Sequence, residues 1–159
     1  MSDLFQIDYF QMFVRLEQMY KGNNLTYRRN DTNGNDIDCF INAKPCQVKF
    51  TSCRDTANLF STHFHKSAGR LNGKQIRNPY SVDDRFDFLI VEVRDKENEN
   101  TILPNFYIIP KQELVKQKKI STSTEPGATF LSVACPSTMK PHWTTPFLNK
   151  FDAFVSNQN

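Results

Sequence analysis

The sequence has no apolar run that approaches the roughly 18–20 residues needed to cross a bilayer, which argues against a membrane-spanning protein. It also has no basic segment followed by an apolar one near residue 1, as a secretory signal requires. Internal repeats and low-complexity tracts are likewise missing. These absences predict a soluble intracellular protein, in the nucleus or the cytoplasm.

Cysteine is scarce, and its spacing does not favour zinc. None of the four cysteines belongs to a Cys-x-x-Cys pair, and the first three, Cys39, Cys46 and Cys53, lie seven residues apart. Without an export signal, we expect these residues and Cys135 to be buried thiols rather than disulfides.

Acidic residues are almost missing between residues 43 and 79, where seven Lys and Arg stand against Asp55 alone. The net charge of the chain is only +3, but a local basic surface of this kind can hold a phosphate backbone. The alternative is a basic loop exposed to water. The length of 159 residues and the apolar content of 38% suit a single domain, residues 1–159, around one core.

A helix is predicted over residues 4–21. Its apolar stripe is formed by Phe10, Phe13, Val14 and Tyr20. The spacing also places Glu17 on this stripe. A carboxylate in an apolar stripe is costly unless it is paired or binds a cation, which makes Glu17 a candidate metal ligand. The alternative is a position at the edge of the stripe, where the carboxylate reaches water.

Alternating side chains predict two strands that follow the helix, over residues 36–41 and from residue 46. Asp36 and Asp38 share one face of the first strand. Gln47 and Lys49 share one face of the second, with the cysteines and the valine of the two strands on the opposite faces.

The turn between these strands sets their register. A hairpin centred between Ala43 and Lys44 pairs Asp38 with Lys49, and directly opposed residues lie on the same face of a sheet. Ala-Lys is not a favoured two-residue turn, so a looser turn over residues 42–45 with the same register is expected. The polar side chains of both strands therefore gather on one surface.

The rest of the chain is predicted to continue in short elements. We expect strands at 59–66, 87–93, 106–109 and 129–134, a loop at 67–79, a short helix after Pro110 and a terminal helix within 145–155. This order predicts an α+β (mixed α/β) domain with a central mixed sheet flanked by helices.

Asp38 and Lys49 on one face of the sheet are the smallest set of side chains that a metal-dependent site for phosphodiester hydrolysis needs. Carboxylate oxygens hold Mg²⁺, and a nearby lysine orients or deprotonates the attacking water and offsets charge on the phosphate. The alternative is an ordinary cross-strand ion pair, worth less than about 1 kcal/mol.

Residues 36–42 followed by Gln47-Val48-Lys49 resemble the strand–turn–strand of PD-(D/E)xK nucleases. The closest subgroup is the homing-endonuclease-like and restriction-like one that carries Gln in place of the second acid. Residues 87–91, 106–110 and 143–154 resemble the later strands and the terminal helix of that subgroup, so the likeness spans nearly the whole chain. The resemblance implies a restriction-endonuclease-like core.

The resemblance also implies a role for each polar residue. Asp38 takes the position of the first metal ligand, with Asp36 as an alternative or helping ligand. Gln47 takes the second-acid position, Lys49 the lysine position, and Glu17 that of the acid on the first helix. Because a neutral amide removes a negative charge, the affinity for Mg²⁺ or Mn²⁺ falls unless Asp36 or Glu17 compensates.

Two functions follow from this resemblance. The first is a metal-dependent endonuclease that hydrolyses phosphodiester bonds, in DNA rather than RNA. Its homodimer would cut both strands, because one site cuts one strand. The second is a catalytically inactive nuclease-fold module that binds nucleic acid or a protein partner. In either, the candidate phosphate contacts are Lys66, Arg70, Lys74 and Arg77.

Other residues carry less specific signals. His63 and His65 lie two apart on a predicted strand, where they either bind a metal or are surface histidines. The rings of Tyr80, Phe86 and Trp143 either stack on bases or fill the core.

Overall fold

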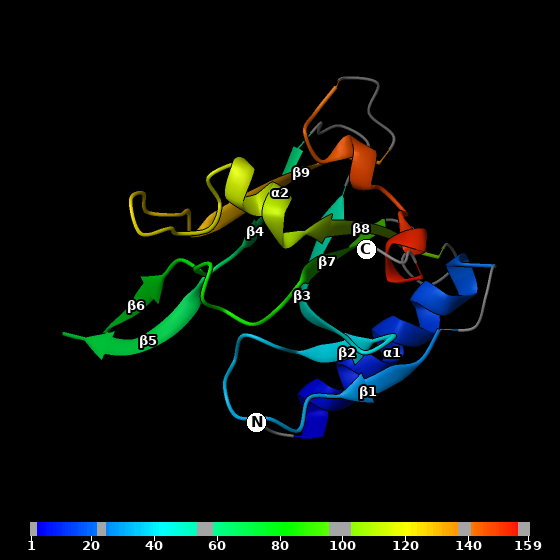
Figure 1. Ribbon diagram of the computed structural model, residues 1–159, viewed down its shortest axis with the longest axis horizontal. Helices are drawn as coiled ribbons and strands as arrows, with labels where there is room; N and C mark the ends of the chain where they lie inside the picture. Colours follow the sequence, from blue (N-terminus) through cyan, green and yellow to red (C-terminus); the bar gives the residue numbers. More distant parts are fainter. Residues whose placement is uncertain (1–2, 22–24, 54–58, 96–102, 137–140, 156–159) are drawn as a thin grey trace.

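The computed structural model describes residues 3–21, 25–53, 59–95, 103–136 and 141–155. Figure 1 shows an α+β fold in which helical elements flank a central mixed sheet of five strands, as the sequence predicted. Over the same residues, no helix combines the length and the apolarity that a membrane crossing needs.

The central sheet has the strand order β1-β2-β3-β7-β8. The strands are β1 (Tyr27–Arg29), β2 (Cys39–Ile41), β3 (Lys44–Cys53), β7 (Phe88–Asp95) and β8 (Asn105–Pro110). The central pair, β3 with β7, is parallel, and the other neighbours are antiparallel.

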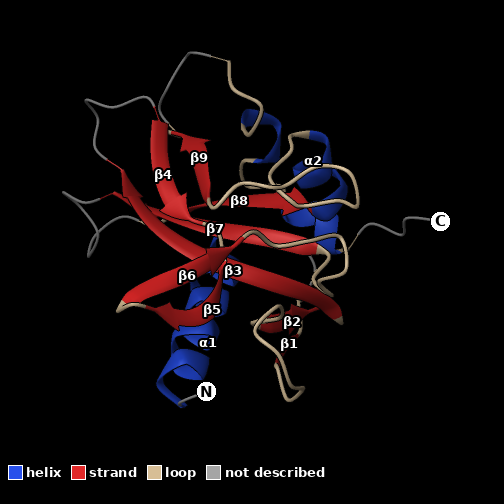
Figure 2. Cartoon of the chain, turned by 90° about the vertical axis from the view of Figure 1, so that its left-hand side faces the viewer, coloured by secondary structure: helices blue, strands red, loops and turns tan. Residues whose placement is uncertain are grey.

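Two antiparallel pairs of strands form separate small sheets. They are β4 (Leu59–His63) with β9 (Phe130–Ala134), and β5 (Lys66–Leu71) with β6 (Lys74–Asn78). The helical elements are α1 (Asp3–Met19), α2 (Lys111–Lys116) and two 3₁₀ turns, η1 (Thr145–Phe147) and η2 (Phe151–Phe154). Figure 2 shows the same sheets from the side, with the β5–β6 hairpin in front of the central sheet.

Each face of the central sheet has its own hydrophobic core, because successive side chains of a strand point to opposite faces. On one face, Cys46 and Val48 of β3 belong to a core cluster with Met12 and Leu16 of α1 and with Phe154 of η2. The second cluster joins the other face of β7 and β8 to α2 and β9 through Leu89, Val91, Tyr107, Ile109, Leu114, Leu131 and Val133.

The first helix was predicted correctly, but its buried stripe only in part, since Phe13 is buried as expected and Phe10 and Val14 are not. Met12 and Leu16 are fully buried, whereas Phe10 and Val14 expose 51% and 37% of their surface and Glu17 is exposed. Apolar residues lie on two sides of this helix, so periodicity alone did not single out the side that packs on the sheet. The alternative reading of Glu17, as a carboxylate that reaches water, is the one observed.

The predicted register of the β2–β3 hairpin was wrong by two residues. Ile41 pairs with Lys44, where the predicted register pairs it with Cys46. The connection is a tight two-residue turn at Asn42 and Ala43, with φ of +50° and +64°. Positive φ at both positions is typical of the turn type that matches strand twist, and Asn adopts it readily. A change of the register by an even number of residues leaves each side chain on the predicted face of the sheet.

Residues 67–79 were predicted as a loop, but most of them form the β5–β6 hairpin. The strand predicted over residues 59–66 ends at His63, and β5 starts at Lys66. Asn72 and Gly73 make the turn with φ of +53° and +78°. Asn-Gly is the strongest short-range signal for a hairpin, but the prediction of a loop was based on the polar composition of the surrounding residues.

The segment from residue 145 to 155 forms two 3₁₀ turns instead of the predicted terminal helix. Asn149, with φ of +53°, separates them, and its Oδ1 accepts a hydrogen bond of 2.9 Å from the backbone N–H of Phe106. Pro146 is exposed, whereas Phe151 and Phe154 are buried as expected. Strands β7, β8 and β9 and helix α2 lie where they were predicted, and β1 was missed.

The side of α1 that is buried, with Leu16 on it, leads to a prediction about stability. Leu16→Ala should lower the free energy of unfolding by about 2–5 kcal/mol, because it leaves a cavity in the core. Val14→Ala, on the exposed side of the same helix, should change it by no more than about 0.5 kcal/mol. Urea unfolding of both variants measures the difference, and equal losses would contradict the observed orientation of α1.

Candidate active site

Gln47 and Lys49 lie on the face of β3 opposite to α1. Their partners in β7, Leu89 and Val91, belong to the second core cluster, whereas Val48 belongs to the first. The predicted separation of polar and apolar residues along this strand is therefore confirmed.

Asp38, directly before β2, is buried against the start of β3. It exposes only 4% of its surface, and its Oδ2 accepts a hydrogen bond of 2.7 Å from the backbone N–H of Val48. The Tyr9 hydroxyl of α1 donates a second hydrogen bond to this carboxylate. Burial raises the pKa of Asp38 to about 6, although Val48, the positive charge of Lys49 and Tyr9 all oppose the rise. Its carboxyl group thus titrates close to neutral pH.

Lys49 is the cation that accompanies Asp38. Burial lowers the pKa of the Lys49 ammonium group, and the nearby Asp38 carboxylate opposes this shift. The Lys49 Nζ lies 5.7 Å from the centroid of the Tyr80 ring. An acid and a base whose pKa values are both displaced by burial are typical of functional sites.

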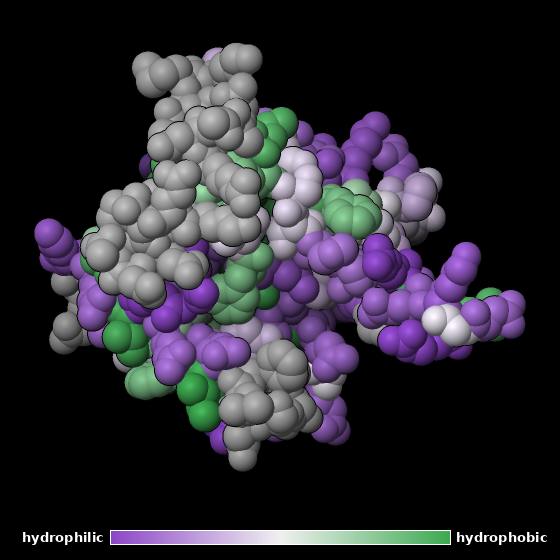
Figure 3. All heavy atoms as spheres, turned by 180° about the vertical axis from the view of Figure 1, so that it is seen from behind, coloured by the Kyte–Doolittle hydropathy of each residue, from purple (hydrophilic) through white to green (hydrophobic). Residues whose placement is uncertain are grey.

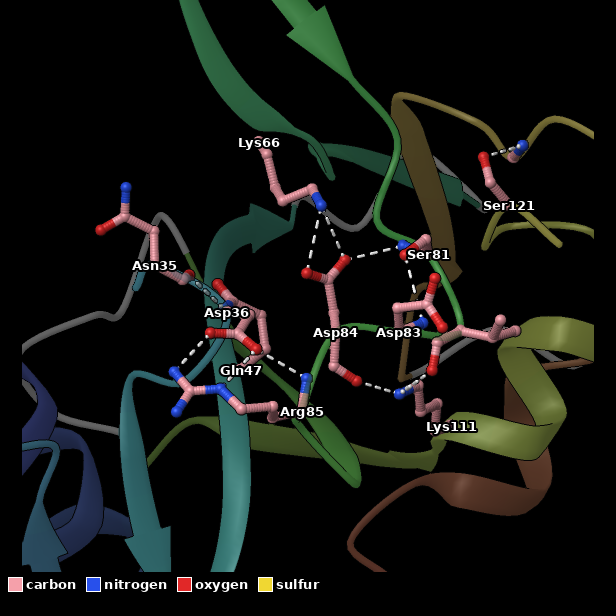
Figure 4. Close-up of polar contacts among 12 residues, drawn as sticks. Asn35, Asp36, Gln47, Lys66, Ser81, Asp83, Asp84, Arg85, Lys111 and Ser121 are labelled. Atoms are coloured by element: carbon pink, nitrogen blue, oxygen red, sulfur yellow. Dashed lines mark hydrogen bonds and ion pairs between the residues drawn. The ribbon is translucent and has the colours of Figure 1, made fainter. Parts of the chain in front are cut away.

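Asp36 is held by Arg85 rather than facing an open space (Figure 4). The Arg85 Nη2 lies 2.8 Å from Oδ1, and the Nε and the backbone N–H lie 3.0 and 2.6 Å from Oδ2. These hydrogen bonds lower the pKa of Asp36 to about 2. Both carboxylate oxygens therefore have donors, and the pair anchors the loop that precedes Asp38.

Gln47 is almost fully buried, with 2% of its surface exposed. Its Nε2 donates a hydrogen bond of 3.1 Å to the Asn35 carbonyl oxygen, as Figure 4 shows. This contact fixes the orientation of the amide. The side-chain oxygen of Gln47 is then the atom that can serve as a cation ligand.

The four predicted phosphate contacts all come from the β5–β6 hairpin. Lys66 is the first residue of β5 and lies at the base of this hairpin. The Lys66 Nζ lies 3.0 and 3.1 Å from the two carboxylate oxygens of Asp84 (Figure 4). Asp84 precedes Arg85, so two neighbouring residues tie the hairpin and the Asp36 loop to the chain before β7. The other three candidates, Arg70, Lys74 and Arg77, are exposed.

His65 lies between the hairpin and Lys49. Burial lowers its pKa first, and electrostatic interactions with Arg77, His63 and Lys49 lower it further, whereas a backbone hydrogen bond with Thr129 opposes the shift. His65 is therefore within electrostatic reach of Arg77 on the hairpin and of Lys49 beside the buried Asp38.

Glu17 does not join the buried cluster. It is exposed on α1, two turns after the exposed Phe10, and the helix residue that contacts Asp38 is Tyr9. Sequence reasoning missed Tyr9, which the alternative periodic stripe with Met12 would have indicated. It also missed Arg85, for which no local pattern in the sequence gives a signal.

The oxygen atoms of this cluster fit a cation that takes its remaining ligands from water and from the substrate. Among the described residues, no group of three or more His, Cys, Asp or Glu side chains is placed to hold a metal ion. Mg²⁺, however, commonly keeps several waters and binds through one or two carboxylates together with substrate phosphates. The Asp38 carboxylate and the Gln47 amide oxygen meet that smaller requirement.

The remaining candidates are the cysteines and the aromatic rings. Cys39, Cys46 and Cys135 are buried thiols, as expected, whereas Cys53 is only half-buried. Tyr80 and Phe86 are core residues with 3% and 0% exposure, which leaves the half-buried Trp143 as the more accessible of the predicted stacking rings.

Two solved structures resemble this fold. One is the crystal structure of MepB, with a TM-score of 0.54 and 16% sequence identity over 86% of this chain and 94% of that one. The other is the bacterial homing endonuclease I-Ssp6803I, with a TM-score of 0.56 and 16% identity over 91% of this chain and 85% of that one. No family profile and no curated protein matches the sequence. The likeness shows a nuclease-like fold.

The contrast between the two aspartates is measurable by carboxyl ¹³C NMR. Asp38 should titrate with a midpoint near pH 6, whereas Asp36, with a pKa of about 2, should stay ionised above pH 4. A midpoint for Asp38 near the ordinary value of about 4 would contradict its burial.

The same shifts set the pH dependence of stability. Because the folded-state pKa of Asp38 is raised, its ionisation costs stability as the pH rises from about 4 through 6, and Asp38→Asn should remove that cost. The depressed pKa of Asp36 has the opposite sign: its stabilisation is present above about pH 4 and is lost as the pH falls towards 2.

Proposed function

We propose that this chain is a metal-dependent endonuclease that hydrolyses phosphodiester bonds in DNA at the Asp38–Gln47–Lys49 cluster, with Mg²⁺ or Mn²⁺ as cofactor. The observation that carries the proposal is the buried Asp38 beside the half-buried Lys49, whose pKa values are displaced in opposite directions. Withdrawing ionisable groups from water, even in part, costs stability, and such a cost is typical of catalytic sites.

Each residue has a distinct part in this chemistry. Lys49 holds a positive charge next to the position of the phosphate and hydrogen-bonds the oxygen that gains charge in the transition state. Tyr9 and the Val48 N–H keep the Asp38 carboxylate in one orientation, and Asn35 does the same for Gln47. A bound Mg²⁺ supplies Lewis-acid polarisation of the phosphoryl oxygen and lowers the pKa of a bound water.

The exposed basic side chains of the hairpin, Arg70, Lys74 and Arg77, support nucleic acid as the substrate. Arg77 and Lys49 both lower the pKa of His65, so the basic hairpin and the lysine of the cluster lie within electrostatic reach of one residue. The homing endonuclease among the structural neighbours has the same fold, which agrees with DNA as the substrate. One site cuts one strand, so cleavage of both strands requires two copies of the chain.

A specific observation favours the second function, an inactive module that binds nucleic acid. Of the three predicted acidic ligands, Asp36 is occupied by Arg85 and Glu17 is exposed, which leaves Asp38 as the carboxylate in the cluster. Asp38 then has to hold the cation with neutral oxygens and the substrate's own phosphate. If that is insufficient, the fold keeps its binding surface without cleavage.

Cleavage of supercoiled plasmid, single-stranded DNA and RNA with Mg²⁺, Mn²⁺ or EDTA tests the proposal. Lys49→Ala and Asp38→Asn should each lower a metal-dependent rate by about a hundredfold or more, because each removes a group from the reacting centre. Lys116→Ala, an exposed lysine of α2, is the matched control and should keep the wild-type rate. Thermal unfolding of each variant verifies that it is folded.

The outcomes separate the two functions. Metal-dependent cutting that survives both site substitutions would place the activity elsewhere. The absence of cutting on every substrate, together with binding that weakens steeply with salt, would favour the inactive module, because phosphate contacts release counterions.

A further inference from the structure

The β5–β6 hairpin projects from the body of the protein as a two-stranded ribbon (Figure 1). Residues 69–78 are all exposed, and Figure 3 shows the arm as mainly hydrophilic atoms extending beyond the rest of the surface. Leu71 exposes 65% of its surface near the tip. An isolated two-stranded hairpin is at best marginally stable in water, and residues 69–78 bury no side chain in the core.

The register divides the arm into two faces of different chemistry, because paired residues of antiparallel strands share a face. Arg70 pairs with Gln75, and Arg77 lies on the same side of β6 as Gln75. We call these three residues the arginine face. Leu71 pairs with Lys74, and the opposite face thus carries Leu71, Lys74 and Ile76.

A bulge between Ser67 and Arg70 lies within the arm, next to Gly69 with φ of +92°. A bulge increases the local twist of a ribbon, and glycine is the residue that adopts this backbone conformation without strain. No heavy atom lies within 4 Å of the position that a Gly69 Cβ would take, so the glycine serves the backbone shape and not close packing.

We propose that the arm enters the major groove of duplex DNA and reads base edges with Arg70, Gln75 and Arg77, an inference that rests on the proposed function. The major groove of B-DNA admits a two-stranded ribbon. Arginine pairs with the two acceptors of guanine, and glutamine pairs with the donor and acceptor of adenine. The arginine face thus carries both side-chain types that distinguish purines, and Lys74 on the other face is a phosphate contact.

The position of the arginine face relative to the site agrees with this arrangement. The Arg77 guanidinium lies 6.0 Å from the centroid of the Phe130 ring, and its charge acts on His65, which is also affected by Lys49. Under this proposal, one duplex bound at the arm extends towards the cluster, since Arg77 and Lys49 both lie within electrostatic reach of His65. The ribbon also selects DNA over duplex RNA, because the major groove of A-form RNA is too deep and narrow for side chains to read.

Binding to a duplex library with about 10 random base pairs, roughly one helical turn, tests the inference. The protein is held in EDTA, so that cleavage plays no part, and the bound fraction is sequenced. Wild type should enrich guanine and adenine at a few positions. Arg70→Ala/Gln75→Ala should lower the discrimination at those positions about tenfold or more. Lys74→Ala, the control on the opposite face, should weaken binding to all sequences equally and keep the preference.

The inference is overturned if the double variant keeps the wild-type preference, or if wild type binds duplex DNA in a salt-sensitive manner without any preference. It is also overturned if duplex RNA competes as well as duplex DNA. In these cases binding to nucleic acid, and so the proposed function, survives. A wild-type protein that binds no nucleic acid at all would overturn both. Circular dichroism of each variant verifies that the fold is intact.

Discussion

The alternation of side chains along β3 is the constraint on which the rest of the structure depends. Val48 and its neighbours on one face pack under α1, whereas Gln47 and Lys49 on the other approach the second core and the site. The parallel pairing with β7 holds this strand at the centre of the sheet. Any change that turned β3 over would exchange a polar cluster for an apolar core, at a cost that no local adjustment offsets.

Those parts of the fold that depend on strand periodicity could be predicted from the sequence. The positions of β7, β8, β9 and α2, and the face shared by Gln47 and Lys49, follow from alternation and from apolar runs. The fold class follows from the order of the elements. The predicted register of the β2–β3 hairpin was wrong because it depended on the turn. Asn42 readily adopts the αL conformation, and the turn is therefore tighter than the expected connection.

The candidate site could be predicted only in part. Asp38 and Lys49 are close in sequence and are joined by one hairpin, so local rules bring them together. The prediction that Glu17 lies on the buried stripe was wrong because two sides of α1 are apolar, and the sheet decides which side is buried. The role of Arg85 depends on the contact between Asp36 and a residue 49 positions later, which no local rule reaches.

The exposed arm has a consequence for handling the protein in solution. Each of its two strands has one edge that no described strand covers, so backbone N–H and C=O groups are open to another chain. Lysine and arginine side chains oppose such edge-to-edge pairing by mutual repulsion. At 0.1 M salt, repulsion between exposed charges that lie more than about 10 Å apart is largely screened, and this distance shortens as salt is added. High ionic strength therefore removes the protection, and the colloidal stability of this protein should decrease as salt is added.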